Sequence, residues 1–161
     1  MTTDLRIGLG WDRHRLEVGR PCFLAGVELD CPVGPKAHSD GDAVLHAVTD
    51  ALLGAAGLDD LGTLFSDQDP RWKDVASTEF LQETMRLLQE KDLAPRSLDI
   101  VIVCDQPRIG PNRTRMREHL ARLLGLPFDR VNLKGKSTEG GDSSCIEVQA
   151  VALLCGSISA L

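Results

Sequence analysis

Two short stretches of the sequence place metal-binding side chains at spacings that bring them together. In "GWDRH", residues 10–14, Asp12 and His14 are separated by one residue, so on an extended chain both side chains project to the same side. In "AHSDGDAVLHAVTDALLGAAG", residues 37–57, His46 lies in an otherwise apolar run. Two ligands from a strand and one from a helix make a three-ligand site. An Asp/His/His set with one open position suits a catalytic zinc or a similar divalent ion.

The helix predicted around His46 carries two acidic residues on the same face. Asp42, His46 and Asp50 follow one another at intervals of four, and such positions lie close to one face of a helix. A buried carboxylate is costly unless it is paired or metal-bound, so Asp42 and Asp50 are candidates for orienting a histidine ligand. Capping or ordinary surface charge explains them equally well. For His46 itself, the alternative to a metal ligand is a core histidine hydrogen-bonded to one of these carboxylates.

The pattern of apolar residues predicts the elements that position these side chains. Helices are expected at 42–56, 77–91 and 111–125, from helical spacing and from the Pro and Gly that frame the last one. Strands are expected at 5–10, 21–29, 98–104, 130–137 and 145–158, with a loop at 31–42 and an irregular acidic stretch at 57–72. This order indicates an α+β fold, with helices on one face of a mixed four-stranded sheet.

Composition limits the function classes. The 161 residues fit one domain spanning 1–161, and the net charge of -6 gives no reason to expect nucleic acid or a membrane surface as a partner. The five cysteines are odd in number and form no C-x-x-C, which predicts reduced thiols rather than a disulfide framework or a thiolate zinc site. No signal peptide or membrane-spanning run is evident, so a cytoplasmic location is expected.

Four motifs taken together resemble one enzyme family. They are "GWDRH", "AHSDGDAVLHAVTDALLGAAGL", "DLGTLFSDQDP" and "VNLKGKSTE". The chain is similar over nearly its whole length to the 2-C-methyl-D-erythritol 2,4-cyclodiphosphate synthases of the non-mevalonate isoprenoid pathway. The resemblance implies a homotrimer with active sites between neighbouring subunits. It also implies conversion of 4-diphosphocytidyl-2-C-methyl-D-erythritol 2-phosphate to the cyclic diphosphate with release of CMP.

The resemblance also assigns roles to individual residues. Zinc is expected on Asp12, His14 and His46, and a second ion, Mg²⁺ or Mn²⁺, bridging the substrate diphosphate on Glu139. His38 and Ser137 match the residues credited with stabilising the transition state. The methylerythritol-binding segment matches Asp60 and Gly62, and the stretch "CDQPRIGP", residues 104–111, matches the loop that holds cytosine.

Further residues are candidates for substrate contacts, and for some of them the sequence leaves an ordinary structural alternative. Ser39 opens the predicted helix, where backbone amides near 40–42 could face an anion. Asp67 and Asp69 in "SDQDP" could contact substrate, but a turn built by Asp and Pro is equally expected. Lys136 could approach a phosphate, with a solvated strand end as the alternative. Arg108, in the cytosine loop, could touch the nucleotide phosphate, and Thr138 is a further candidate for substrate binding.

The sequence departs from the family pattern after Glu139. The family has a longer glycine-rich segment there with a Phe and an Arg, whereas this chain continues "GGDSSCIEVQAVALL". In the family that Arg helps to line a cavity on the threefold axis where an isoprenoid diphosphate can sit, and the sequence leaves open whether such a ligand binds here without the Phe and the Arg. Because the segment is altered, an enzyme with a shifted diphosphate substrate and a non-catalytic trimer that binds metal and nucleotide are the alternative functions.

Overall fold

A computed structural model describes residues 3–72 and 75–157. The main elements, in chain order, are β1 (Thr3–Val18), β2 (Cys22–Leu24), β3 (Val27–Leu29), β4 (Val33–Pro35), α1 (Ala43–Ala55), α2 (Leu61–Leu64), α3 (Ser77–Glu90), β5 (Leu93–Val103), α4 (Arg113–Leu124), β6 (Val131–Lys136) and β7 (Cys145–Ser157). Short 3₁₀ turns precede α4 and β6. No helix among the described residues is long and apolar enough to cross a membrane.

The main sheet has five strands in the order β4-β1-β7-β5-β6. All neighbours are antiparallel except β5 and β6, which run parallel, so the sheet is mixed. The α+β class is therefore confirmed, but the prediction of four strands is wrong. The additional strand is β4, three residues long, inside the stretch 31–42 that was expected to be a loop.

Other element predictions need smaller corrections. The expected strand 5–10 is much longer, since β1 continues to Val18. The expected strand 21–29 is a two-stranded hairpin of its own, because Ala25 and Gly26 both adopt positive φ, 57° and 71°, and turn the chain. The irregular stretch 57–72 contains the short helix α2. The last expected strand is present to residue 157, and Ile158 lies outside the described residues.

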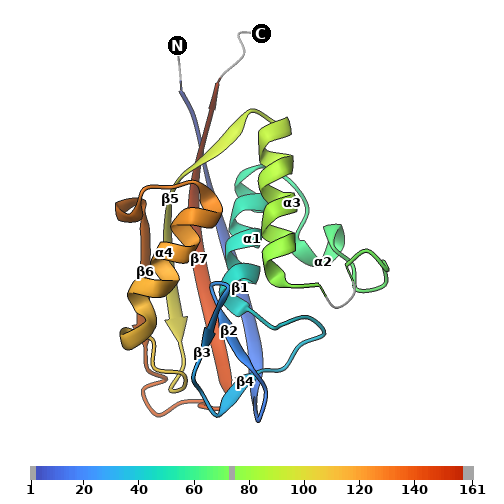
Figure 1. Cartoon of the computed structure of the whole chain (residues 1–161). Helices are drawn as coiled ribbons and strands as arrows, with labels where there is room; N and C mark the ends of the chain where they lie inside the picture. The colour runs from blue at the N-terminus through green and yellow to red at the C-terminus, as the bar shows by residue number, and fades with distance from the viewer. Residues whose placement is uncertain (1–2, 73–74, 158–161) are drawn as a thin grey trace.

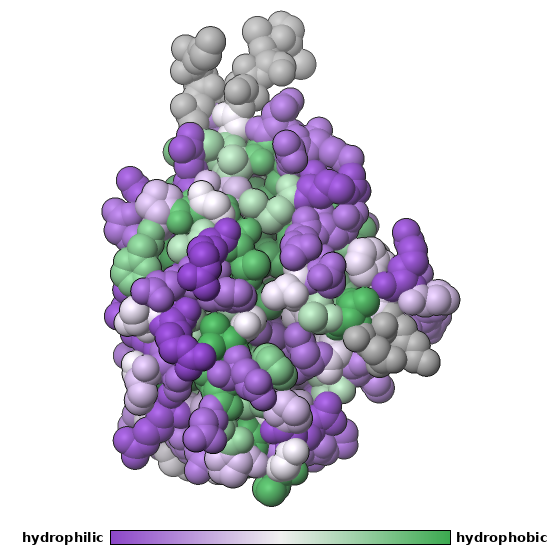
Figure 2. All heavy atoms as spheres, in the orientation of Figure 1, coloured by the Kyte–Doolittle hydropathy of each residue, from purple (hydrophilic) through white to green (hydrophobic). Residues whose placement is uncertain are grey.

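Helices cover one face of the sheet (Figure 1). Helix α1 packs on β1 and β7, α3 packs on α1 and β5, and α4 packs on β6. Figure 2 shows this face of the molecule, where hydrophilic residues predominate along α3 and α4. The side chains that β1 directs away from α1 are apolar but exposed: Leu5, Ile7, Leu9 and Trp11.

Two glycines of β1 let the strand touch the backbone of α1. A Cβ built on Gly10 would lie 1.8 Å from the carbonyl oxygen of Ala47, and one built on Gly8 would lie 1.9 Å from that of Ala51. No side chain fits at either position without moving the helix away from the sheet. This close approach sets the distance between α1 and β1, the two elements that carry the three candidate metal ligands.

We therefore expect Gly10→Ala to lower the free energy of unfolding by about 3 kcal/mol, because the added methyl group meets helix backbone that cannot rotate aside. Urea unfolding followed by circular dichroism measures the change. The matched control is Gly54→Ala, on the exposed side of α1, where a Cβ meets nothing within 4 Å. That substitution should leave stability unchanged or raise it by up to about 1 kcal/mol. Equal effects of the two substitutions would contradict the proposed role of the glycines.

Candidate active site

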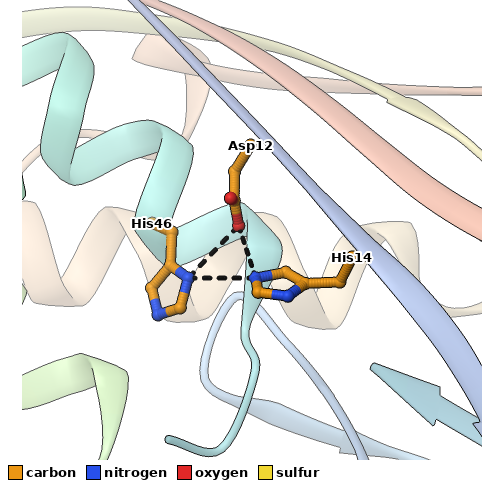
Figure 3. Close-up of side chains that lie close together, drawn as sticks. All are labelled: Asp12, His14 and His46. Atoms are coloured by element: carbon orange, nitrogen blue, oxygen red, sulfur yellow. Dashed lines mark hydrogen bonds and ion pairs between the residues drawn. The ribbon is translucent and has the colours of Figure 1, made fainter. Parts of the chain in front are cut away.

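The three predicted metal ligands lie together where β1 passes the first turn of α1 (Figure 3). Asp12 Oδ2 lies 2.8 Å from His14 Nε2 and 3.2 Å from His46 Nδ1. The two ring nitrogens are 3.3 Å apart. The alternation of β1 directs Asp12 and His14 to the same side, as the D-x-H spacing predicts, and α1 brings His46 to meet them.

Two sides of this triangle, 3.2 and 3.3 Å, match the edge of a tetrahedral metal site, and the third side, 2.8 Å, is shorter. With bonds of about 2.0–2.1 Å to nitrogen and oxygen, neighbouring ligand atoms of a tetrahedron lie about 3.3 Å apart. His14 also has the required tautomer, because its Nδ1 lies 3.0 Å from the carbonyl oxygen of Lys36 and can only donate to it. Its Nε2 therefore turns a lone pair toward the carboxylate of Asp12. The donor set fits a divalent cation, which would relieve the repulsion between these facing acceptors.

Within the cluster, the pKa of Asp12 is lowered and that of His14 is raised, so both shifts favour a negative carboxylate beside a positive imidazole. Burial raises the pKa of Asp12, but when His14 and His46 are protonated and no metal ion is bound, their hydrogen bonds and charge outweigh it and bring the pKa to about 2. Burial lowers the pKa of His14, and the hydrogen bond and charge of Asp12 more than compensate, so that the pKa lies above its ordinary value. Asp12 is thus a permanent anion at neutral pH, as a metal ligand must be.

A pocket of about 890 Å³ opens beside this cluster. Its lining combines His14 and His46 with four other residues predicted from the sequence, namely His38, Ser39, Gly62 and Asp67. Two cationic side chains that were not predicted also line it, Arg20 and Lys36. A wall of apolar side chains completes it: Leu61, Phe65, Trp72 and Phe80. The pocket can therefore accept an anionic ligand that also carries an apolar part.

The other predicted site residues do not line this pocket. Ser137 hydrogen-bonds Glu139, and Thr138 binds the carboxylate of Asp105 through its amide and hydroxyl. With Lys136 and Arg108, these residues form an exposed group beyond the carboxyl ends of β5 and β6. One chain thus presents the predicted site in two separate parts.

Two acidic residues near the pocket make local contacts. Asp60 caps α2 by accepting from the amide of Thr63, and Asp69 pairs with Arg71 at 2.7 Å. The structure therefore favours the turn interpretation for Asp69.

Asp42 and Asp50 bond to backbone amides rather than to histidines. Asp42 is fully buried, caps α1 through the amide of Leu45, and also accepts from the amides of Ala25 and Gly26 in the β2–β3 turn. Burial raises the pKa of Asp42 to about 6. Asp50 accepts from the amide of Leu61 at 2.7 Å and so joins α1 to α2. Of the two interpretations left open by the sequence, the geometry supports capping and tethering.

The family model that matches this chain is that of the YgbB family, over residues 5–155. The chain belongs to the YgbB family. A 2-C-methyl-D-erythritol 2,4-cyclodiphosphate synthase of Thermus thermophilus is 49% identical over 152 residues, covering 94% of this chain and all of that one. The chloroplastic synthase of Arabidopsis thaliana is 44% identical over 142 residues, 88% of this chain and 62% of that one.

Solved structures of YgbB-type enzymes have the same fold. A 2C-methyl-D-erythritol-2,4-cyclodiphosphate synthase in its CDP-bound form superposes with a TM-score of 0.90 at 48% identity, covering 92% of this chain and 99% of that chain. The bifunctional IspDF of Campylobacter jejuni gives a TM-score of 0.91 at 32% identity, covering 97% of this chain and 43% of that one. The resemblance read from the four motifs is therefore confirmed.

Besides the apolar wall of the pocket, sequence reasoning missed four polar or charged residues of this YgbB-family site. Arg20 reaches the pocket from the connection between β1 and β2, and Lys36 directly follows β4; nothing in their spacing pointed to a ligand. Asp40 and Ser77 contact each other, and Ser77 also contacts His46. Asp40 stands in the "AHSDGD" motif and could have been found there, whereas Ser77 is visible only as the first residue of α3.

Purified protein should bind one divalent ion per chain at this cluster, and His46→Ala should abolish that binding because two ligands cannot hold the ion. Isothermal titration calorimetry of metal-free protein with Zn²⁺ measures it. His119→Ala is the control, since His119 lies on α4 and bonds the carbonyl of Ala25 instead. Full-strength binding in His46→Ala would place the ion elsewhere.

Proposed function

We propose that this chain converts 4-diphosphocytidyl-2-C-methyl-D-erythritol 2-phosphate to 2-C-methyl-D-erythritol 2,4-cyclodiphosphate and CMP. It would thus be a phosphorus–oxygen lyase of the non-mevalonate isoprenoid pathway, and its relatives are named 2-C-methyl-D-erythritol 2,4-cyclodiphosphate synthases. The observation that carries the proposal is the Asp12–His14–His46 triangle at the wall of a pocket that also contains cationic side chains. We also propose a cytoplasmic location with reduced thiols, which agrees with the five cysteines being free of disulfide bonds.

The reaction joins two anions, so its main requirement is positive charge. The 2-phosphate oxygen attacks the β-phosphorus of the diphosphate, and CMP leaves as a stable phosphate that needs little acid catalysis. Zinc on Asp12, His14 and His46, with Mg²⁺ or Mn²⁺ at Glu139, would supply positive charge that neutralises the phosphates and aligns them for in-line attack.

The chain itself contributes donors around the same pocket. Lys36 is held at the rim by Glu17, and Arg20 donates to the carbonyl of Ala37, so both cations are positioned next to the phosphate-binding region. His38 is exposed at the pocket and can donate a hydrogen bond to a phosphate oxygen as charge develops. Ser39, Asp60, Gly62 and Asp67 surround the position proposed for the methylerythritol unit.

The second part of the site is proposed to hold the nucleotide. Residues 104–111 form the loop expected to surround cytosine, with Arg108 near the nucleotide phosphate, and Ser137, Lys136 and Thr138 lie at the adjoining end of β6. Relatives solved with CDP support a cytidine nucleotide as the ligand. Because one chain presents these residues apart from the metal-binding pocket, we propose that each active site combines the two parts from neighbouring subunits.

The uncovered face of the sheet supports the homotrimer that this arrangement needs. Leu5, Ile7, Leu9 and Trp11 are 53–72% exposed in the single chain, and Val151 lies beside Leu9 on β7. A contiguous apolar row of this kind is rarely left in contact with water. Burying it against equivalent strands of two further copies would bring the two site parts of different subunits together.

The protein should release CMP from the diphosphocytidyl substrate and form the cyclic diphosphate, identified by phosphorus NMR. His38→Ala should lower kcat about 10²- to 10³-fold, because a donor to the developing phosphate charge is lost. His119→Ala should retain wild-type activity. Binding of CDP without turnover by folded, zinc-loaded protein would instead support a non-catalytic trimer, and turnover of a different nucleoside diphosphate would support a shifted substrate.

Sedimentation should give three times the chain mass of 17.5 kDa. Leu9→Arg should produce monomers without activity, because a charge in the apolar row opposes its burial. Its zinc binding should remain, since all three ligands belong to one chain. The control is Val18→Arg at the far end of β1, a residue 85% exposed, which should stay trimeric and active. An active Leu9→Arg monomer would contradict a site shared between subunits.

A further inference from the structure

The two ring nitrogens of His46 have different partners. Nδ1 faces Asp12 and His14 in the metal-binding triangle. Nε2 points the opposite way and lies 2.9 Å from the hydroxyl oxygen of Ser77, the first residue of α3. A second hydroxyl, that of Ser39, is 3.5 Å away and makes at most a weak contact. The main partner of His46 outside the triangle is therefore a single, fully buried serine.

Ser77 in turn is held by Asp40. The hydroxyl of Ser77 donates to Oδ1 of Asp40, and the backbone amide of Ser77 donates to Oδ2 at 3.0 Å. The amide of Asp42 adds a contact to Oδ1 at 3.2 Å. The carboxylate thus lies at the amino end of α3, where the helix dipole stabilises a negative charge.

The direction of these hydrogen bonds fixes the proton on His46. A carboxylate only accepts, so the single proton of the Ser77 hydroxyl is donated to Asp40. The oxygen of Ser77 must then accept, and the proton that it accepts is the one on Nε2 of His46. That leaves Nδ1 without a proton, with its lone pair directed at the position where an ion would sit.

We propose that Asp40 and Ser77 are positioning residues that select the metal-binding tautomer of His46 and hold its ring. Histidine ligands commonly donate a hydrogen bond from the N–H of their second ring nitrogen to a carboxylate or a carbonyl group. Here a serine hydroxyl is inserted between histidine and carboxylate, whereas His14 uses the carbonyl of Lys36 directly. The inference deepens the proposed function and rests on the metal site of that proposal.

We call the hydrogen bonds that run from His46 through Ser77 to Asp40 the relay. Asp40→Asn tests their direction with little change in the shape of the side chain. In D40N the side-chain amide can donate to the Ser77 oxygen, which turns the hydroxyl proton toward Nε2 and leaves the proton of His46 on Nδ1. The amide oxygen can still accept from the backbone of Ser77, so capping of α3 is retained. We expect zinc affinity to fall about 10- to 100-fold in D40N and in Ser77→Ala, measured by competition with a chromophoric chelator.

A spectroscopic measurement separates this role from a purely structural one. In zinc-free protein labelled with ¹⁵N-histidine, long-range ¹H–¹⁵N spectra should show His46 protonated on Nε2 in the wild type and shifted toward Nδ1 in D40N. Ser77→Thr, which keeps the hydroxyl, should retain wild-type tautomer and affinity. Thr84→Val is the matched control: Thr84 is buried on the same helix, and its hydroxyl has no partner among the described residues.

The outcomes distinguish the two proposals. Wild type that binds zinc, with unchanged affinity and tautomer in D40N and Ser77→Ala, would overturn the relay and leave the proposed function standing. Wild type that binds no zinc would overturn both. Loss of affinity in Thr84→Val equal to that in Ser77→Ala would show a general effect of α3 packing and would also overturn the relay.

Discussion

The close packing of α1 on β1 is the constraint on which the rest of the site depends. Gly8 and Gly10 leave no side chain between the strand and the helix. The facing positions of the helix, at intervals of four, are buried alanines: Ala43, Ala47, Ala51 and Ala55. Two strand residues advance about 6.6 Å and four helix residues about 6.0 Å, so the two rows remain in step. Gly10 faces Ala47 and Gly8 faces Ala51, and one further step places Asp12 beside the first turn of α1, where His46 projects.

The acidic side chains around this junction are held by hydrogen bonds from backbone amides. Asp42, at the start of α1, accepts from amides of its own helix and of the β2–β3 turn, so a single buried carboxylate fixes the hairpin against the helix. Asp40 fixes the start of α3 in the same way. Two helices and a hairpin are thereby held around His46 by acidic side chains. An anionic substrate therefore depends on local cations; in a chain of net charge -6, Arg20 and Lys36 provide two of them, and a divalent ion on Asp12, His14 and His46 would add a third.

The sequence predicted those features that depend on neighbouring residues, such as strand alternation and helical spacing. The D-x-H pair works because strand alternation directs both side chains to one side, and the helix around His46 is within one residue of its prediction at each end. The hairpin at 22–29 was missed because Ala25, a residue that rarely adopts positive φ, occupies the turn. The link between Asp40 and Ser77 spans 37 residues and arises only when α3 packs on α1, so no spacing in the sequence could reveal it.

The division of the site into two parts gives a reason for the shape of the fold. The metal-binding triangle belongs to the β1–α1 side of the sheet, whereas the residues expected to hold the nucleotide lie at the ends of β5 and β6. The apolar row extends along β1 from Leu5 to Trp11, on the face that no helix covers. Association through that face would build three sites at once, each with the metal and phosphate-binding half from one subunit and the nucleotide-binding half from the next. On this view the exposed row is as much a part of the catalytic apparatus as the ligands, because without it neither half has a partner.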